Sequence, residues 1–210
     1  MIKVLIADDH PIVRQGLRQI LAGIPDMEVA GEAVNSQETL RQVRVGGWDV
    51  LVLDITMPGR SGFDILKELK HEQPDLPVLV LSIHAEEQLA VRALKAGASG
   101  YLTKENAPEE LVKAIRKVVS GGRYISPRLA ETLALGLDAA SDRPRHETLS
   151  DREFQVMQLM ARGKTLAEIA EELSLSAKTV STYRTRLMEK LNLKTNADLM
   201  RYALDHGLIE

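Results

Sequence analysis

Short, nearly continuous hydrophobic segments alternate with amphipathic segments over the first 120 residues. The segments 2–7, 49–53 and 78–82 consist mainly of Val, Ile and Leu, and 27–33 and 100–103 are two further candidate strands. Strands that are hydrophobic on both faces are typical of parallel sheets with helices on both sides. The alternation therefore predicts an α/β fold, a doubly wound (βα)5 unit with a five-stranded parallel sheet.

Residues that favour helix starts and ends lie between the predicted strands. Capping pairs join a side chain to the first helical turn, and glycine favours the left-handed residue after a helix. The signals are Pro11 and Pro108 in first turns, the pairs Asn35 with Glu38 and Ser61 with Asp64, and Gly97 after a helix.

The pattern changes after about residue 104, where no further strand is predicted. The segment 127–137 favours a short helix, and 138–147 is small, polar and charged, as in a linker. From 149 onwards only short helices are predicted. Their starts are the capping boxes Ser150 with Glu153 and Thr165 with Glu168, then Ser176 before 177–191, and Thr195 or Asn196 before a last helix that ends at Gly207.

These patterns predict two domains. The first, 1–121, is the α/β domain, and 122–147 is a linker with a short helix. The second, 148–210, is a small all-α domain of four helices.

Composition limits the function classes. The 210 residues are 44% hydrophobic and 27% charged, with a formal net charge of −3, which fits two small globular domains. There is no cysteine, so disulfides and thiolate metal sites are excluded. No hydrophobic segment approaches the ~18 residues of a membrane span, and the N-terminus lacks a signal-peptide pattern. We expect a cytoplasmic protein with no membrane partner.

Polar side chains stand at the carboxyl ends of the predicted strands. Asp8 and Asp9 follow the first strand, Asp54 follows the third, Ser82 ends the fourth and Lys104 follows the fifth. Ligands bind at this edge of doubly wound sheets. Clustered carboxylates repel one another unless a cation joins them, and Mg²⁺ (or Mn²⁺) prefers such oxygen ligands. The set predicts a site where a carboxylate nucleophile takes up a phosphoryl group.

Each of these residues has a simpler interpretation when it is taken alone. An aspartate after a strand usually caps a turn or a helix, and a single lysine there usually lies in solvent. The hypothesis of a phosphoryl site depends on complementary groups at four strand ends of one sheet.

Four motifs connect this half with a known family: LIADDH, LVLDITMPGRSG, VLVLSIHA and AGASGYLTK. Through them, residues 1–121 resemble the receiver domain of two-component response regulators. The resemblance implies that a sensor histidine kinase donates a phosphoryl group to Asp54. It also implies that Asp9, Asp54 and the backbone carbonyl of Thr56 ligate Mg²⁺, with Asp8 holding the metal or one of its waters.

The same resemblance implies a conformational switch. Lys104 would pair with the phosphoryl oxygens, Ser82 would turn towards them, and Tyr101 would be the aromatic residue that rotates with it. Two positions depart from the family pattern. Glu105 stands where many receivers have proline, and Ile83 stands where a small residue is common. We expect Ile83 to narrow access to the phosphoacceptor and to slow labelling by small phosphodonors.

Residues 165–191 have the pattern of a helix, a turn and a second helix. In the second helix, Val180, Tyr183, Leu187 and Leu191 fall on one side at helical spacing. Short polar and basic side chains on an apolar back suit a DNA major groove, although an exposed or partner-binding helix has the same pattern. The candidate DNA contacts are Lys178, Thr179, Ser181, Thr182, Thr185 and Arg186.

A second resemblance favours DNA binding. The runs LSDRE and ARGKTLAEIAEELSLSAKTVSTYRTRLMEKL make residues 149–208 similar to a LuxR-type helix-turn-helix. Together with a receiver, this is the architecture of the NarL/FixJ subfamily, and SAKTVSTYR is closest to the branch that includes the GacA and UvrY regulators. Tyr183 and Thr185 depart from the common pattern, which puts the base preference in question.

The second resemblance also implies partners. The segment 177–191 would be the recognition helix, and 196–206 would pair two copies on promoter DNA as a homodimer. RNA polymerase is a further candidate partner. Phosphorylation of Asp54 would then alter dimerisation and promoter binding.

Three other functions stay open on sequence alone. An aspartyl-phosphate phosphatase of the haloacid-dehalogenase kind would carry a second aspartate two residues after the nucleophile, where Thr56 stands. A regulator that binds DNA without phosphorylation conflicts with the complete acidic site. A protein-interaction module would retain no DNA. We expect no enzyme activity beyond phosphorylation and dephosphorylation of Asp54 itself.

Overall fold

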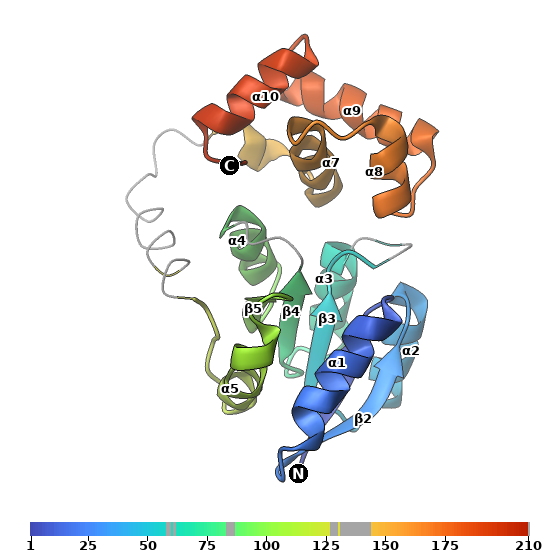
Figure 1. Cartoon of the computed structure of the whole chain (residues 1–210), viewed down its shortest axis with the longest axis vertical. Coiled ribbons are helices and arrows are strands. Elements are labelled where there is room, and N and C mark those ends of the chain that lie inside the picture. The colour runs from blue at the N-terminus through green and yellow to red at the C-terminus, as the bar shows by residue number, and fades with distance from the viewer. Residues whose placement is uncertain (58–59, 61, 83–86, 127–129, 131–143, 210) are drawn as a thin grey trace. The chain divides into compact units, whose positions relative to one another are not determined.

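The computed structural model describes residues 1–57, 60, 62–82, 87–126, 130 and 144–209 (Figure 1). Contacts between Cα atoms divide the chain into two compact units, 1–133 and 134–210. The predicted capping residue Ser61, Ile83 and nearly all of the predicted helix 127–137 lie outside the described residues. Within the described ranges, no helix is long and apolar enough to cross a membrane.

The first unit contains a five-stranded sheet in the order β2-β1-β3-β4-β5, and all neighbouring strands are parallel. This confirms the predicted fold class. The third strand ends on Asp54 itself, one residue later than its hydrophobic run. The strands are β1 (Ile2–Ala7), β2 (Met27–Ala33), β3 (Val50–Asp54), β4 (Val78–Ser82) and β5 (Gly100–Thr103).

Both faces of the sheet are covered, as its continuous hydrophobic runs predict. One face packs against α1 (Pro11–Ala22) and α5 (Ala107–Val119). Val52 of β3 lies in that core, while its neighbours Leu51 and Leu53 are equally buried. Successive strand residues point to opposite faces, so the second face is covered as well. Each fully buried aliphatic side chain contributes about 1.5–3 kcal/mol.

This unit also contains α2 (Ser36–Val45), α3 (Gly62–Glu72) and α4 (Glu87–Lys95). The predicted cap of α2 is present, because the Asn35 side chain accepts a hydrogen bond from the Glu38 backbone N–H. Gly97 follows α4 with φ +106°, the left-handed conformation expected there.

Within residues 144–209, the described part of the second unit, there are a 3-10 helix, η1 (Arg145–Thr148), and four α-helices. Each predicted N-cap is a hydroxyl side chain that accepts a backbone N–H from its own first turn. The last helix starts after Thr195, which also forms a capping box with Asp198. The helices are α7 (Asp151–Ala161), α8 (Leu166–Glu172), α9 (Ala177–Leu191) and α10 (Asn196–Asp205).

The capping glutamate of α7 also connects that helix with α9. One Glu153 oxygen accepts hydrogen bonds from the Ser150 backbone N–H (2.8 Å) and from Lys190 Nζ (2.6 Å). Burial alone would raise the pKa of Glu153, but Lys190 and Ser150 outweigh it and lower the pKa. The Glu153 carboxylate thus caps the N-terminus of α7 and also binds α9 through Lys190.

Candidate functional site

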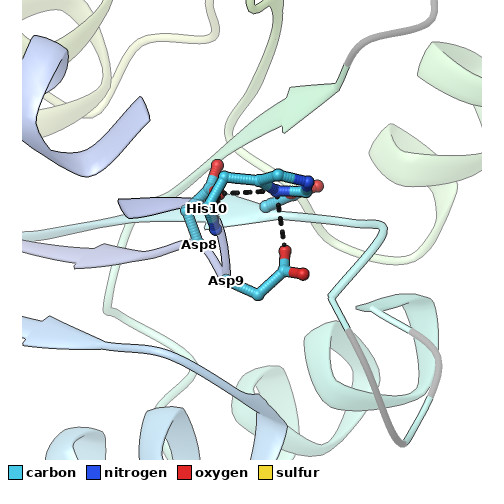
Figure 2. A group of neighbouring side chains, drawn as sticks. Asp8, Asp9 and His10 are labelled. Atoms are coloured by element: carbon cyan, nitrogen blue, oxygen red, sulfur yellow. Dashed lines mark hydrogen bonds and ion pairs between the residues drawn. The ribbon is translucent and has the colours of Figure 1, made fainter. Parts of the chain in front are cut away.

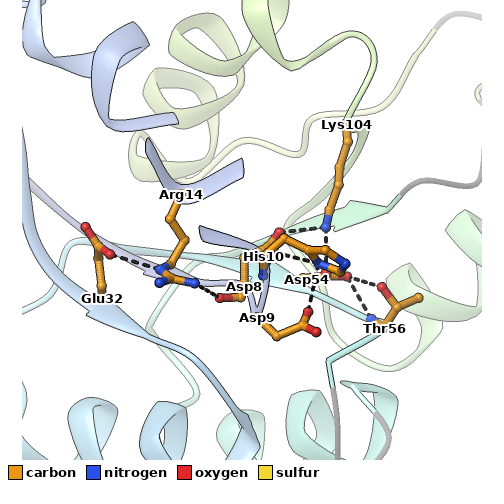
Figure 3. Close-up of polar contacts among 8 residues, drawn as sticks. All are labelled: Asp8, Asp9, His10, Arg14, Glu32, Asp54, Thr56 and Lys104. Atoms are coloured by element: carbon orange, nitrogen blue, oxygen red, sulfur yellow. Dashed lines mark hydrogen bonds and ion pairs between the residues drawn. The ribbon is translucent and has the colours of Figure 1, made fainter. Parts of the chain in front are cut away.

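Four of the polar residues predicted at the strand ends, Asp8, Asp9, Asp54 and Lys104, meet at one edge of the parallel sheet (Figure 3). Asp8 follows β1, Asp54 ends β3 and Lys104 follows β5. Since β1 and β3 are neighbours in the sheet, their carboxyl ends bring the two carboxylates together. Both carboxylates are almost completely buried, so their charges depend on the groups that contact them.

Lys104 pairs with both buried carboxylates. Its Nζ lies 2.6 Å from Asp54 Oδ2 and 2.6 Å from Asp8 Oδ2. Burial alone would lower the pKa of Lys104, but the two carboxylates outweigh it and raise the pKa. Burial and the nearby Asp54 charge raise the pKa of Asp8, although Lys104 opposes this. The ammonium group therefore holds two anions that would otherwise repel each other.

The second oxygen of Asp54 is held by Thr56. Asp54 Oδ1 accepts hydrogen bonds from the Thr56 backbone N–H (2.8 Å) and from its hydroxyl (2.6 Å). These bonds fix the orientation of the carboxylate. The sequence singled out only the backbone carbonyl of Thr56, whose role as a metal ligand stays a prediction.

Asp9 and His10 complete a cluster around the end of β1 (Figure 2). One potential ligand atom from each of Asp8, Asp9, His10 and Asp54 lies within 4.8 Å of the others. The three carboxylates are hard oxygen donors, which fit a divalent cation such as Mg²⁺. The sequence interpretation missed His10, although it directly follows the two aspartates.

Arg14 is a second residue that the sequence interpretation missed. It donates one hydrogen bond to the backbone carbonyl of Asp8 (2.8 Å) and another to Glu32 on β2 (3.0 Å), as Figure 3 shows. This arginine on α1 therefore fixes the backbone from which the acidic cluster projects. No sequence pattern indicates the pairing, because Glu32 is 18 residues away.

The two predicted switch residues contact each other. Ser82 ends β4 and is completely buried, and Tyr101 on the adjacent strand β5 is 6% exposed. Burial raises the pKa of Tyr101, the hydrogen bond with the Ser82 side chain lowers it, and the Asp54 charge raises it again. The two hydroxyl groups are thus linked across β4 and β5, and β4 is the strand next to the one that ends at Asp54.

In the second unit, α9 presents one apolar and one polar side, as predicted. Val180, Leu187 and Leu191 are buried, and Tyr183 is half-buried. Of the six candidate DNA contacts, Thr179 is half-buried, with its hydroxyl 2.7 Å from that of Ser176 at the N-cap. The exposed candidates are Lys178, Ser181, Thr182, Thr185 and Arg186.

Two large apolar side chains of α10 are exposed. Met200 and Leu204 are 40% and 57% exposed, while Leu199 and Ala203 on the same helix are buried. Positions four apart lie on the same side of a helix. Thus α10 has a buried apolar side and a second, exposed apolar strip.

Known families match both units. Residues 4–116 match the family model of the response regulator receiver domain, and residues 147–203 match that of the bacterial regulatory proteins of the luxR family. The chain is a response regulator. Its two domains, a receiver and a LuxR-type helix-turn-helix, place it among the NarL/FixJ-type transcription regulators.

Relatives of this response regulator match it over nearly its whole length. Response regulator UvrY of Escherichia coli (strain K12) is 39% identical over 209 residues, which cover 99% of this chain and 96% of UvrY. Response regulator GacA of Pseudomonas aeruginosa is 39% identical and covers 100% of this chain and 99% of GacA. The predicted similarity to the GacA and UvrY branch is confirmed.

Solved structures show the same architecture. RcsB from Salmonella enterica serovar Typhimurium, bound to promoter P1flhDC in the presence of phosphomimetic BeF3-, has 31% identity and a TM-score of 0.67, with 96% of this chain and 97% of RcsB covered. The response regulator ChrA of a heme-sensing two-component system has 31% identity and a TM-score of 0.54, with 99% and 98% covered.

Proposed function

We propose that this response regulator accepts a phosphoryl group on Asp54 from a sensor histidine kinase. The observation that carries the proposal is the environment of the carboxylate. Lys104 donates to Oδ2 and Thr56 donates to Oδ1, so the nucleophile is held in one orientation. In the transfer, the bond from phosphorus to the kinase imidazole breaks and a bond from phosphorus to an Asp54 oxygen forms, giving an acyl phosphate.

Asp8, Asp9 and Asp54 would hold a divalent cation at this site, together with the backbone carbonyl of Thr56. When bound, Mg²⁺ or Mn²⁺ supplies positive charge for the phosphoryl oxygens. Lys104 exchanges its contact with Asp54 for one with a phosphoryl oxygen, and it remains paired with Asp8. Thr56 keeps the remaining Asp54 oxygen in position.

The Ser82–Tyr101 pair would transmit the change. Ser82 lies at the end of the strand next to β3, so its hydroxyl can turn towards a phosphoryl oxygen. That rotation removes the hydroxyl from Tyr101, which then reorients at β5.

Promoter DNA is the proposed partner of α9, with Lys178, Thr179, Ser181, Thr182, Thr185 and Arg186 at the interface. The support is the exposed polar side of α9 and the likeness to RcsB, which was solved bound to promoter DNA. The exposed strip of α10, Met200 and Leu204, suits a homodimer on a two-fold site. RNA polymerase is a further proposed partner. We also propose the domain limits expected from the sequence: a receiver at 1–121, a linker at 122–147 and a DNA-binding domain at 148–210.

The environment of Asp54 does not favour a phosphatase. Thr56 stands where such an enzyme has an aspartate that protonates the leaving group, and its hydroxyl already donates to Asp54. The regulatory family is not typically enzymatic.

Intact mass spectrometry tests the phosphoacceptor. The protein is incubated with Mg²⁺ and acetyl phosphate, or with a promiscuous histidine kinase, beside Asp54→Ala. Asp64→Ala is the matched control, because Asp64 is an exposed aspartate on α3. We expect one acid-labile phosphoryl adduct on the wild type and on Asp64→Ala, and none on Asp54→Ala. An adduct that persists in Asp54→Ala would place the acceptor elsewhere.

DNA binding tests the second half of the proposal. The phosphorylated and unphosphorylated proteins select fragments from a genomic library, and their affinities for the selected fragment are compared. We expect tighter binding after phosphorylation. Equal affinity would indicate a regulator that is independent of phosphorylation, and no retained fragment would indicate a protein-interaction module.

A further inference from the structure

The His10 ring lies among the carboxylates of the acidic cluster. Its Nδ1 atom is 3.0 Å from Asp9 Oδ1 and 3.3 Å from Asp8 Oδ1 (Figure 2). The backbone N–H of His10 donates to the same Asp8 oxygen (2.8 Å), which fixes the turn from which the ring projects. The imidazole is therefore held beside the oxygens proposed as metal ligands.

These separations match those of neighbouring ligands on one metal ion. Two adjacent ligands of an octahedral ion with bonds of about 2.1 Å lie about 3.0 Å apart, and opposite ligands lie about 4.2 Å apart. The ligand atoms of Asp8, Asp9, His10 and Asp54 fall within 4.8 Å of one another. One ion can thus reach the nitrogen and the carboxylates with small side-chain adjustments.

His10 Nδ1 is within hydrogen-bonding distance of Asp8 Oδ1 and within ion-pair distance of Asp9 Oδ1. Asp9 Oδ1 is buried and accepts no hydrogen bond within the described ranges of the chain. In the tautomer that carries its proton on Nε2, the Nδ1 lone pair faces both carboxylates, and a cation shared by the three atoms removes their repulsion. The His10 side chain is 60% exposed, so a cation can approach it from solvent.

We propose that His10 is a ligand for divalent transition-metal ions at this site, in addition to the carboxylates. The inference rests on the proposed carboxylate metal site. Mg²⁺ prefers oxygen and would bind the carboxylates alone, whereas imidazole suits Co²⁺, Ni²⁺, Cu²⁺ and Zn²⁺. The site then takes Ni²⁺ more tightly than Mg²⁺ and is open to competition between the two ions.

Calorimetric titration of the untagged full-length protein with NiCl₂ and with MgCl₂, at one fixed pH, separates the two modes. We expect His10→Gln to weaken Ni²⁺ binding at least tenfold and to change Mg²⁺ binding less than twofold. Asp9→Asn should weaken both ions, because it removes a shared ligand. His71→Gln is the matched control, since His71 is an exposed histidine on α3, and it should change neither ion.

Pulsed electron paramagnetic resonance with Cu²⁺ provides a direct readout of the ligand. The wild type should show coupling to an imidazole nitrogen that is lost in His10→Gln and suppressed by excess Mg²⁺. Unchanged Ni²⁺ affinity in His10→Gln, or nitrogen coupling that survives it, overturns the proposal for His10. Failure of Mg²⁺ to bind the wild type instead overturns the underlying carboxylate site, so the two failures are distinct.

Discussion

Gly62 at the start of α3 lies so close to the backbone of Ile55 that one added methyl group should disturb the turn after Asp54. A Cβ atom on Gly62 would lie 2.5 Å from Ile55 Cα, 2.5 Å from Ile55 O and 2.8 Å from Ile55 C. Ordinary contacts are 3.4–4 Å, so the two backbone segments would have to separate by about 1 Å. Ile55 directly follows Asp54, is completely buried and donates its N–H to Leu81 O of β4.

The expected cost of Gly62→Ala follows from these contacts. Overpacking costs about 1–3 kcal/mol, and weakening the Ile55 hydrogen bond adds about 1 kcal/mol. The free energy of unfolding of the receiver should fall by about 2–4 kcal/mol, which lowers its Tm by about 10 °C. Gly16→Ala is the matched control, because nothing lies within 4 Å of its Cβ position and it is inside α1. It should raise stability by up to about 1 kcal/mol.

Urea unfolding of the two variants and the wild type measures these changes, and phosphorylation by acetyl phosphate is followed at a temperature where all three are folded. We expect Gly62→Ala to be labelled more slowly, because displacement of Ile55 moves Asp54 and Thr56. Gly16→Ala should be labelled at the wild-type rate. The reasoning is refuted if Gly62→Ala is as stable as Gly16→Ala, since the close backbone approach would then carry no cost.

Three further predictions concern other parts of the chain. Lys178→Ala and Arg186→Ala should each remove a phosphate contact, which weakens DNA binding and reduces the slope of log affinity against log salt concentration by about one. Fluorescence anisotropy measures both quantities, and a loss of affinity confined to one DNA sequence would contradict a phosphate contact. Glu153→Gln should remove about 1 kcal/mol at pH 7. Because the folded pKa of Glu153 is lowered, the wild type loses this stability as pH falls below 4.5 and through the folded pKa, whereas the variant does not. Thermal unfolding at pH 7 and at about pH 3 measures the difference. Gly31→Ala should displace the single tryptophan, Trp48, whose ring atom Cη2 lies 2.5 Å from the new Cβ, and an unchanged emission spectrum would contradict this.

Much of the fold could be predicted because its signals are local. The strands of the receiver are continuous hydrophobic runs, and each α-helix in the described part of the second unit begins with a hydroxyl cap three residues before its partner. Asp54 and Lys104 were also predictable, since each is adjacent to a strand end and parallel strands end at one edge of the sheet. In the structure these two side chains form an ion pair, with 2.6 Å between Lys104 Nζ and Asp54 Oδ2.

The remaining features of the site depend on contacts between distant segments. Arg14 on α1 donates a hydrogen bond to the Asp8 backbone carbonyl, and Glu32 on β2 holds the Arg14 side chain in place. Neither Arg14 nor Glu32 belongs to a strand-end motif. The Thr56 hydroxyl bond requires the turn after β3 to curl back on the carboxylate. Side-chain direction in a turn is decided by its backbone angles, which the pattern of hydrophobic and polar residues does not specify.

The bridge from Lys104 to Asp54 and Asp8 also affects how the chain matures during synthesis. Lys104 emerges from the ribosome 50 residues after Asp54, and domains fold as units once enough of the chain is available. A nascent chain that ends before β5 exposes the edge of β4 and leaves the two acidic groups without their cation. Until translation has passed β5, such a chain lacks the lysine that orients Asp54. If Asp54 is the phosphoacceptor, as proposed, its orientation therefore depends on synthesis and folding of the chain as far as Lys104.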